Sequence, residues 1–350
     1  MRRVFGVVLI GVGVFGLVLA GVVRFWAYPN GEKTPLDLDI PIIATGPAQV
    51  FNADTGQLDA VTLRADRTVK VDSQASDSKN VVVQERLCIV IQVDNPPPCV
   101  RSPDKRLLSF TTDRTAADRK TASSVNDPKY GENVDGNTSI KHSGLTYKWP
   151  FHSKKKTYQF FNPDVGEAAP ATYEGTEKIN GLKLYKYVAI TPKTEQDVFK
   201  GVPGYYVDTR TVWIDPVTGT IVKGNEHQVR SFRGGDLDGK TAVDLNLTFD
   251  TATVAYQTHK AKDGRKQIAL ASFWLPLVSL IVGALALVGG VLLLGRRHRE
   301  PPDEGDAAQS QPATEQGPPG FAAPPQEPVP ANVASRGGSG GSADDTRPQP

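Results

Sequence analysis

The sequence predicts a mainly β protein: an extracytoplasmic antiparallel β-sandwich or open half-barrel, of one or two lobes, bracketed by two transmembrane α-helices. Two long segments carry no charged residue, and short β-branched and aromatic runs fill the region between them. A polar, Pro/Gly-rich tail follows. The expected parts are an N-terminal transmembrane helix (1–28), a β domain (29–267, with a lobe boundary at 120–144), a C-terminal transmembrane helix (268–295) and a disordered tail (296–350).

The first apolar segment runs from Val4 to Val23 and follows two arginines. It is long enough to cross the hydrocarbon core of a bilayer, about 30 Å, as a helix. Val18-Leu19-Ala20 also resembles a cleavage site, so a removed signal peptide is the alternative, although such peptides usually have shorter apolar regions. Gly16 and Ala20 have the small-xxx-small spacing that could pack a second membrane helix closely; the alternative is that glycines are simply frequent in spanning helices.

The second apolar segment runs from Ile268 to Gly295 and ends at the basic stretch Arg296–Arg299. Phe273 and Trp274 lie at its opposite end, where aromatic side chains favour the headgroup level. Pro276 is near that same end, where a missing backbone hydrogen bond is best tolerated. A soluble core helix with this length and uniformity would be unusual, so the segment predicts a membrane span.

Arginines flank both apolar segments on the sides nearer the chain ends. The positive-inside rule therefore predicts a plasma-membrane protein with both termini in the cytoplasm and residues 29–267 outside. Lys260, Lys262, Arg265 and Lys266 lie on the outer side, but long translocated domains escape the charge rule. The tail has little to bury, and we expect either a docking segment for a cytoplasmic partner or a plain solvated chain.

The β domain is predicted from alternating runs that are separated by turn residues. The runs are 61–72, 80–94, 176–190, 205–215 and 244–258. Asn180-Gly181 is the strongest hairpin signal, and only 113–122 shows a weak helical pattern. The strands carry charged residues at alternate positions, which suits water on one face and disfavours a membrane-spanning barrel.

Cys88 and Cys99 are the only cysteines, and the sequence between them reads as a strand, a turn and a return. We expect a disulfide, which forms readily outside the cytoplasm and would contribute about 2–4 kcal/mol. Two free thiols are the alternative. A metal site is not expected, because no second pair of ligands accompanies the cysteines.

The sequence contains few candidate catalytic residues or motifs, and we expect neither an enzyme nor a cofactor. No Walker A, H-E-x-x-H or C-x-x-C motif is present, and a net charge of +2 gives no sign of nucleic-acid binding. Residues 152–156, "HSKKK", could meet lipid head groups or form a solvated loop. Asp236 and Asp238 in "GGDLDG" fit a turn better than a calcium site, because the EF-hand spacing is incomplete.

The stretch "VWIDPVTGTIV" (212–222) raises the question whether Asp215 is catalytic. Aspartate at a turn start accepts backbone N–H groups, Pro216 fixes φ, and Gly219 can adopt the left-handed conformation that ends such a turn. No acid–base partner is close in sequence. We therefore expect Asp215 to be structural, in a strand–turn–strand unit.

Several stretches occur together in order: "ATGPAQVF", "TTDRTAAD", "GLTYKWPF", "YEGTEKINGLKLYKY" and "VWIDPVTGTIV", between two spans. In this order the chain resembles the actinobacterial envelope proteins called the porin PorA family, over residues 1–298. Members similar to mycobacterial polar growth factor A are linked to trafficking of trehalose monomycolate beside a mycolipid flippase. The resemblance implies an accessory protein that handles envelope lipid next to such a transporter.

The second half also resembles the half-barrels of periplasmic lipoprotein carriers, which hold acyl chains against a curved sheet. A sheet with one apolar face must pack on something or hold an apolar ligand. The candidate lipid-binding residues are Ile179, Leu182, Leu184, Val188, Trp213, Ile221 and Val222, with ordinary core packing as the alternative. We expect an envelope lipid-binding protein; a non-catalytic scaffold subunit and an envelope hydrolase are the rival functions.

Overall fold

The computed structural model describes residues 1–199 and 201–295, so the predicted disordered tail lies outside the described residues. The strands are β1 (Asp39–Asn52), β2 (Gln57–Asp72), β3 (Asn80–Ile91), β4 (Leu107–Asp118), β5 (Asn133–Val134), β6 (Tyr158–Asn162), β7 (Glu167–Ile179), β8 (Leu182–Glu195), β9 (Gly204–Ile214), β10 (Ile221–Phe232) and β11 (Thr241–Phe249). The longer helical elements are α1 (Arg2–Val22), η1 (Val23–Ala27), α2 (Tyr28–Gly31), α3 (Thr251–Ala269), η4 (Leu270–Trp274) and α4 (Leu275–Gly295).

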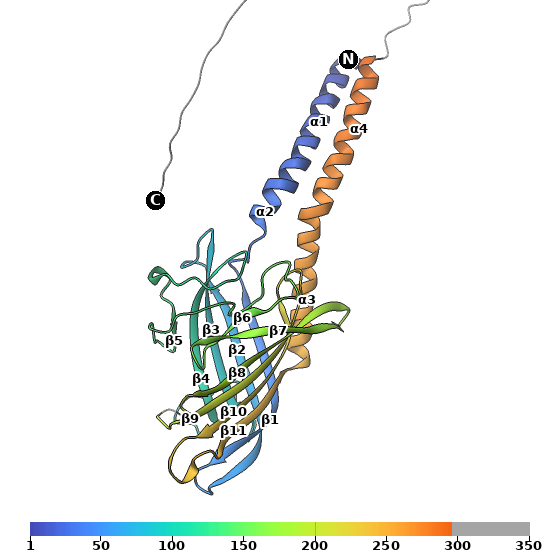
Figure 1. Cartoon of the computed structure of the whole chain (residues 1–350). Coiled ribbons are helices and arrows are strands. Elements are labelled where there is room, and N and C mark those ends of the chain that lie inside the picture. The colour runs from blue at the N-terminus through green and yellow to red at the C-terminus, as the bar shows by residue number, and fades with distance from the viewer. Residues whose placement is uncertain (200, 296–350) are drawn as a thin grey trace, which may run out of the picture. The chain divides into compact units, whose positions relative to one another are not determined.

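All eleven strands form one antiparallel sheet in the order β5-β4-β3-β2-β1-β11-β10-β9-β8-β7-β6. The first and last long strands, β1 and β11, pair at its centre, so the two halves of the chain extend to opposite edges. The sheet is strongly curled (Figure 1). The predicted mainly β half-barrel is therefore confirmed. Residues 120–144, the expected boundary between lobes, contain β5, an edge strand of this single sheet.

The two edges of the sheet are joined through a segment centred on Leu145. The Leu145 N–H donates to the carbonyl of Gln159, and the Leu145 carbonyl accepts from the N–H of Phe161, both at 2.8 Å. On the other side, the Ser124 N–H donates to the carbonyl of Gly144 at 2.8 Å. This segment closes one end of the half-barrel, the end from which the helices leave.

Two turns and the disulfide confirm the sequence predictions. Asn180 and Gly181 join β7 to β8 with φ values of 46° and 83°, as a type I′ hairpin requires. Gly219 has φ 75°, the left-handed conformation expected at the end of the β9–β10 turn. Cys88 and Cys99 are joined, and the bridge ties β3 to the β3–β4 connection.

Two predictions of secondary structure were wrong. The alternating run 244–258 is a strand only to Phe249, because Asp250 accepts the N–H of Thr253 at 2.7 Å and starts α3. This helix lacks a continuous apolar face, which is why the sequence did not reveal it. The weak helical candidate 113–122 is the end of β4 and the turn after it.

The helices α1 and α4 pack as an antiparallel pair, which we call the stalk (Figure 1). Both apolar segments are long enough to cross a membrane. Their buried residues recur every seven positions: Gly6, Gly13 and Ala20 on α1, and Pro276, Gly283 and Gly290 on α4. A Cβ at Gly16 would lie 3.0 Å from the Gly283 Cα, so the predicted packing of Gly16 and Ala20 against a second helix is confirmed.

Candidate functional site

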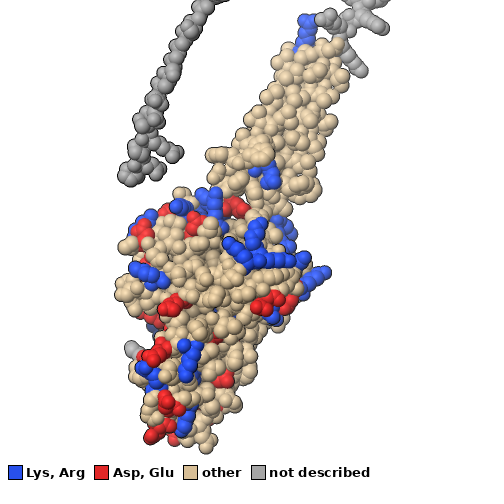
Figure 2. All heavy atoms as spheres, in the orientation of Figure 1, with Lys and Arg blue, Asp and Glu red and all other residues tan. Residues whose placement is uncertain are grey.

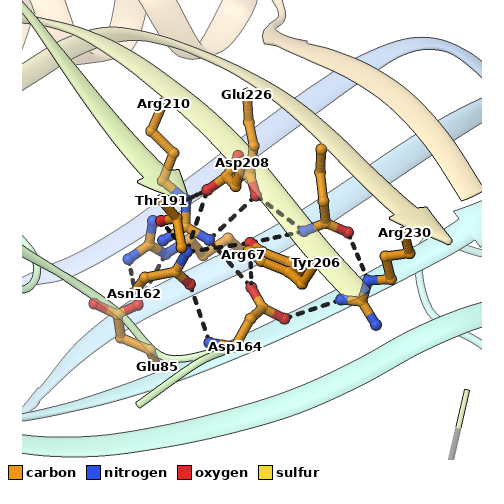
Figure 3. Close-up of polar contacts among 11 residues, drawn as sticks. Arg67, Glu85, Asn162, Asp164, Thr191, Tyr206, Asp208, Arg210, Glu226 and Arg230 are labelled. Carbon is orange, nitrogen blue, oxygen red and sulfur yellow. Dashed lines mark hydrogen bonds and ion pairs between the residues drawn. The ribbon is translucent and has the colours of Figure 1, made fainter. Parts of the chain in front are cut away.

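The middle of the sheet's concave face is polar, although most inward positions on either side of it are apolar. Charged and polar side chains from both halves of the sheet meet there and form what we call the interior charge cluster (Figure 3). Its members are Arg67, Glu85, Asn162, Asp164, Thr191, Tyr206, Asp208, Arg210, Glu226, Gln228 and Arg230.

Arg210 is the hub of this cluster. Its Nε lies 2.8 Å from Asp208 Oδ2, and its Nη2 lies 3.1 Å from Asp164 Oδ2 and 3.2 Å from Glu226 Oε1. Asp164 also accepts from Arg230 Nη2 at 3.0 Å, so one carboxylate bridges two guanidinium groups. These contacts hold β9, β10 and the β6–β7 turn together from inside the sheet.

A second ion pair lies on the opposite half of the sheet, where Arg67 Nε donates to Glu85 Oε2 at 2.9 Å. Burial raises the pKa of Glu85, and it also raises the pKa of Asp208, to about 8, against the opposing effect of Arg210. Three guanidinium groups face four carboxyl groups in the cluster. Protonation of Asp208 leaves three carboxylates opposite three cations, which lowers the cost of burying them.

Neutral side chains also take part in the network. Asn162 Nδ2 donates to Thr191 Oγ1 at 3.0 Å and to Tyr206 Oη at 3.1 Å. Gln228 also donates to Tyr206 Oη, at 3.1 Å, and its own carbonyl accepts from Arg230 at 2.9 Å. Burial raises the pKa of Tyr206, so its hydroxyl stays neutral. The cluster crosslinks the interior by hydrogen bonds that specify one arrangement of the strands.

Aromatic side chains fill the concave face between the cluster and the helix-proximal end. Trp149 and Tyr187 are fully buried there, with ring centroids 5.5 Å apart, and Phe160 packs 4.8 Å from Trp149. Side chains therefore occupy the concave face on both sides of the charge cluster. An acyl chain held inside the half-barrel, as in the lipoprotein carriers, is not supported by this packing.

The predicted lipid-binding residues lie mainly on the outer, convex face. Five of them cluster against Val254 and Ala261 of α3: Ile179, Leu182, Leu184, Trp213 and Val222. Val188 is on the same face of β8 but lies beyond this cluster and is half-buried. Ile221 belongs to the concave face, because a β-bulge between Ile221 and Lys223 reverses the alternation. Their assignment to lipid binding stays a prediction.

The β9–β10 turn, which contains Asp215, holds α3 against the sheet. The carboxylate of Asp215 is fully buried and accepts the N–H and the hydroxyl of Thr218, at 3.2 and 2.7 Å. The expected turn role is confirmed. Sequence reasoning missed its partner, the guanidinium of Arg265, whose Nε donates to Asp215 Oδ1 at 2.8 Å.

The interior charge cluster was also missed, although the sequence carries a signal for it. The inward residues of β2 are Leu63, Ala65, Arg67 and Val69, so one charged residue interrupts an apolar series. The same interruption occurs at Glu85 on β3. A charge at a position whose neighbours on the same face are apolar indicates a buried partner, because an unpaired buried charge is too costly.

The curled sheet and its stalk define a β protein with two helices that could span a membrane. The chain belongs to the Porin PorA family, whose model matches residues 5–292. It is similar to a Porin PorA of Corynebacterium amycolatum, with 24% identity over 254 residues, 54% of this chain and 66% of the relative. A Porin PorA of Corynebacterium resistens is 23% identical over 288 residues, 57% of this chain and 70% of the relative. The matches thus span about two thirds of each relative.

Proposed function

We propose that this protein is a plasma-membrane protein of the cell envelope that binds an envelope lipid on the outer face of its β domain. The stalk crosses the bilayer with both chain ends in the cytoplasm, and the half-barrel stands outside. The family resemblance favours a mycolate glycolipid, such as trehalose monomycolate, received from or delivered to a flippase-type transporter. The protein acts by binding and guiding this lipid, with no catalytic step.

The observation that carries the proposal is a row of side chains along the outer face of β8, which we call the stripe and which is apolar except for Lys186. Leu182 and Leu184 are buried under α3, which continues directly into the stalk. Farther along the same face, Lys186 comes next, followed by Val188, which is half-buried, and Ile190, which is 56% exposed. Because successive even positions of β8 share one face, the stripe leads from beneath the membrane-linked helix to open surface.

The surroundings of the stripe suit an amphiphilic ligand. Trp213 lies beside it on β9, with Lys223 Nζ 4.4 Å and Lys186 Nζ 5.8 Å from its ring. An acyl chain on the far side of Lys186 would cover Val188 and Ile190, and the two lysines would meet the head group. Val207, 36% exposed on the outer face of β9, widens the apolar surface next to Ile190.

The test uses the full chain in membranes and a trehalose monoester that carries a diazirine in its acyl chain. After illumination, mass spectrometry should find the probe on the peptide that contains Leu182–Glu195. Ile190→Lys should strongly reduce this labelling, because it places a charge on the stripe without disturbing the buried core. Leu58→Lys is the matched control, since Leu58 is 40% exposed in the distant β1–β2 hairpin.

Labelling that is absent from β8, or that is equal in the Ile190→Lys variant and the wild type, would contradict the proposal. Lipid that labels only the concave face would move the site to the half-barrel interior and would equally count against the stripe. A photoreactive phosphatidylglycerol run in parallel shows whether the sugar head group matters. Weaker labelling by the glycolipid than by phosphatidylglycerol would reject the mycolate assignment.

A further inference from the structure

A lysine-rich turn, Lys154–Lys156, is held rigidly at the helix-proximal end of the half-barrel. The Lys154 N–H donates to Tyr158 Oη at 2.9 Å, and the hydroxyl of Tyr187 donates to the Lys154 carbonyl at 2.6 Å. Lys155 and Lys156 lie over tyrosine rings, and all three lysines are exposed. The turn therefore presents cationic groups whose backbone is already ordered.

The same turn is connected to the end of the first apolar helix. His152 Nε2 lies 2.8 Å from Glu32 Oε1 and 3.2 Å from Tyr28 Oη. Tyr28 follows the exposed aromatic residues Phe25 and Trp26, which suit the headgroup level. At about 1.5 Å per helical residue, Tyr28 lies roughly 3–5 Å beyond them, so the turn stands within about one Debye length of the bilayer.

Other lysines surround the base of the stalk. The Lys120 ammonium group donates to the Pro29 carbonyl at 2.7 Å. Figure 2 shows basic side chains gathered on the part of the domain next to the stalk, whereas both charge signs mix at the distal end. We call the exposed lysines of this region the lysine collar; they are Lys120, Lys154, Lys155, Lys156, Lys178, Lys183, Lys262 and Lys266.

Few acidic side chains oppose the collar. Glu32 is engaged with His152, and Asp263 is 3.3 Å from Lys266. Glu167, Glu174 and Glu177 are the exposed acids on the neighbouring strand β7. The collar therefore has a clear excess of positive charge. A positive surface so close to a membrane attracts anionic lipid, and each lysine adds to the attraction.

We propose that the lysine collar binds the anionic phospholipid head groups of the leaflet that faces the β domain. The collar lies on both flanks of the stalk, since Lys154–Lys156 follow His152, which contacts Tyr28 of α2, whereas Lys262 and Lys266 lie on α3. Binding on both flanks keeps the helix-proximal end of the half-barrel on the bilayer and fixes the domain's orientation. The inference rests on the membrane insertion of the stalk and is independent of the stripe.

The experiment measures backbone hydrogen exchange of the full chain in nanodiscs of phosphatidylcholine, with or without phosphatidylglycerol. The amides of residues 151–157 should exchange about fivefold more slowly with phosphatidylglycerol, the factor expected for roughly one effective lysine contact. This protection should disappear at about 1 M salt, where the Debye length is about 3 Å. The loop at residues 233–240, at the distal end, should exchange equally in both nanodiscs.

A variant with glutamine at Lys154, Lys155 and Lys156 should lose the lipid-dependent protection. The matched control places glutamine at Lys105 and Lys240, two exposed lysines of the distal loops, and should keep it. An unchanged melting temperature shows that the triple variant is folded. Equal exchange in the two nanodiscs for the wild type, or protection retained in the triple variant, overturns the inference. Either result leaves the labelling test of the stripe unaffected.

Discussion

The guanidinium of Arg265 in α3 contacts the fully buried carboxylate of Asp215 in the β9–β10 turn, with Nε 2.8 Å from Oδ1. One partner belongs to the helix that runs into the stalk and the other to the sheet. The pair therefore attaches the second apolar helix to the half-barrel. Its partial exposure, with the Arg265 side chain 31% accessible, places it between surface and buried ion pairs in strength.

Arg265→Met should lower the free energy of unfolding by about 2 kcal/mol, because it leaves a buried carboxylate without its cation. The double variant with Asp215→Asn should lose less than the sum of the single variants, since the amide needs no counter-ion. Urea unfolding in detergent, followed by tryptophan fluorescence, measures both effects. Lys266→Met, at a neighbouring side chain that is 78% exposed, should change stability by less than about 0.5 kcal/mol. Additive losses would argue against a direct pair.

Gly219→Ala should be strongly destabilising, because a Cβ there would lie 1.9 Å from the Trp149 carbonyl oxygen. Gly239→Ala is the control: Gly239 has φ 76°, against 75° for Gly219, but nothing lies within 4 Å of its Cβ position. The control should cost only about 1 kcal/mol of backbone strain. The melting temperature of Gly239→Ala reports backbone strain alone, and that of Gly219→Ala reports the same strain together with the steric clash. Equal losses would show that Trp149 moves aside freely.

Gly13→Leu should separate the stalk helices, because even a Cβ at this position would lie 2.5 Å from Leu287 Cγ and 2.9 Å from the Gly283 carbonyl. Gly11→Leu should be tolerated, since nothing lies within 4 Å of its Cβ position. Cysteines introduced at Leu9 and Gly289, which are neighbours across the pair, report association by disulfide formation. Crosslinking should fall in the first variant and persist in the second. Equal crosslinking would contradict the packing.

The pH dependence of stability should depend on Asp208. Burial raises its pKa to about 8, so the folded chain holds this proton more tightly than the unfolded chain, where the pKa is near 3.8. The stability that this bound proton contributes is complete below about pH 4. It is lost as the pH rises through 8, at up to about 1.4 kcal/mol per pH unit. Asp208→Asn, neutral at every pH, should show a smaller loss of stability between about pH 5 and pH 8.

Chemical denaturation at several pH values gives the difference between Asp208→Asn and the wild type. Taking this difference cancels other groups that titrate in the range, including Lys148, whose pKa burial lowers to about 7. Asp54→Asn, at a carboxylate that is 84% exposed, serves as the control and should track the wild type. A parallel pH profile for Asp208→Asn and wild type would mean that Asp208 is ionised throughout.

The sequence predicts those features that depend on local pattern. Three features follow from short stretches of sequence that favour one local conformation. They are the Asn180–Gly181 hairpin, the turn role of Asp215 and the two apolar helices. The pairing of Cys88 with Cys99 follows because no other cysteine exists. The half-barrel is predicted less directly. The many alternating strands and the scarcity of helical patterns indicate a curved antiparallel sheet.

The rest depends on contacts between distant residues. The position of α3 was hidden because its few apolar contacts, Val254 and Ala261, do not make an amphipathic pattern. The candidate lipid residues were therefore assigned to a concave groove, whereas five of them lie under α3 on the outer face. The charge cluster joins strands from both halves of the chain, and strand order across a sheet is not encoded locally.

The bridge through Leu145 has a consequence for how other proteins can approach this domain. Exposed strand edges are templates for β-addition, and proteins usually shield them. Here the edge strands are short, β5 with 2 residues and β6 with 5, and the Leu145 segment hydrogen-bonds to β6 directly. β6 pairs with β7 only at residues 167–171, so residues 172–179 of β7 form an edge with no paired strand among the described residues. Strand addition is therefore open to a partner beside this part of β7, whereas a contact on the convex surface or on the stalk would be made with side chains.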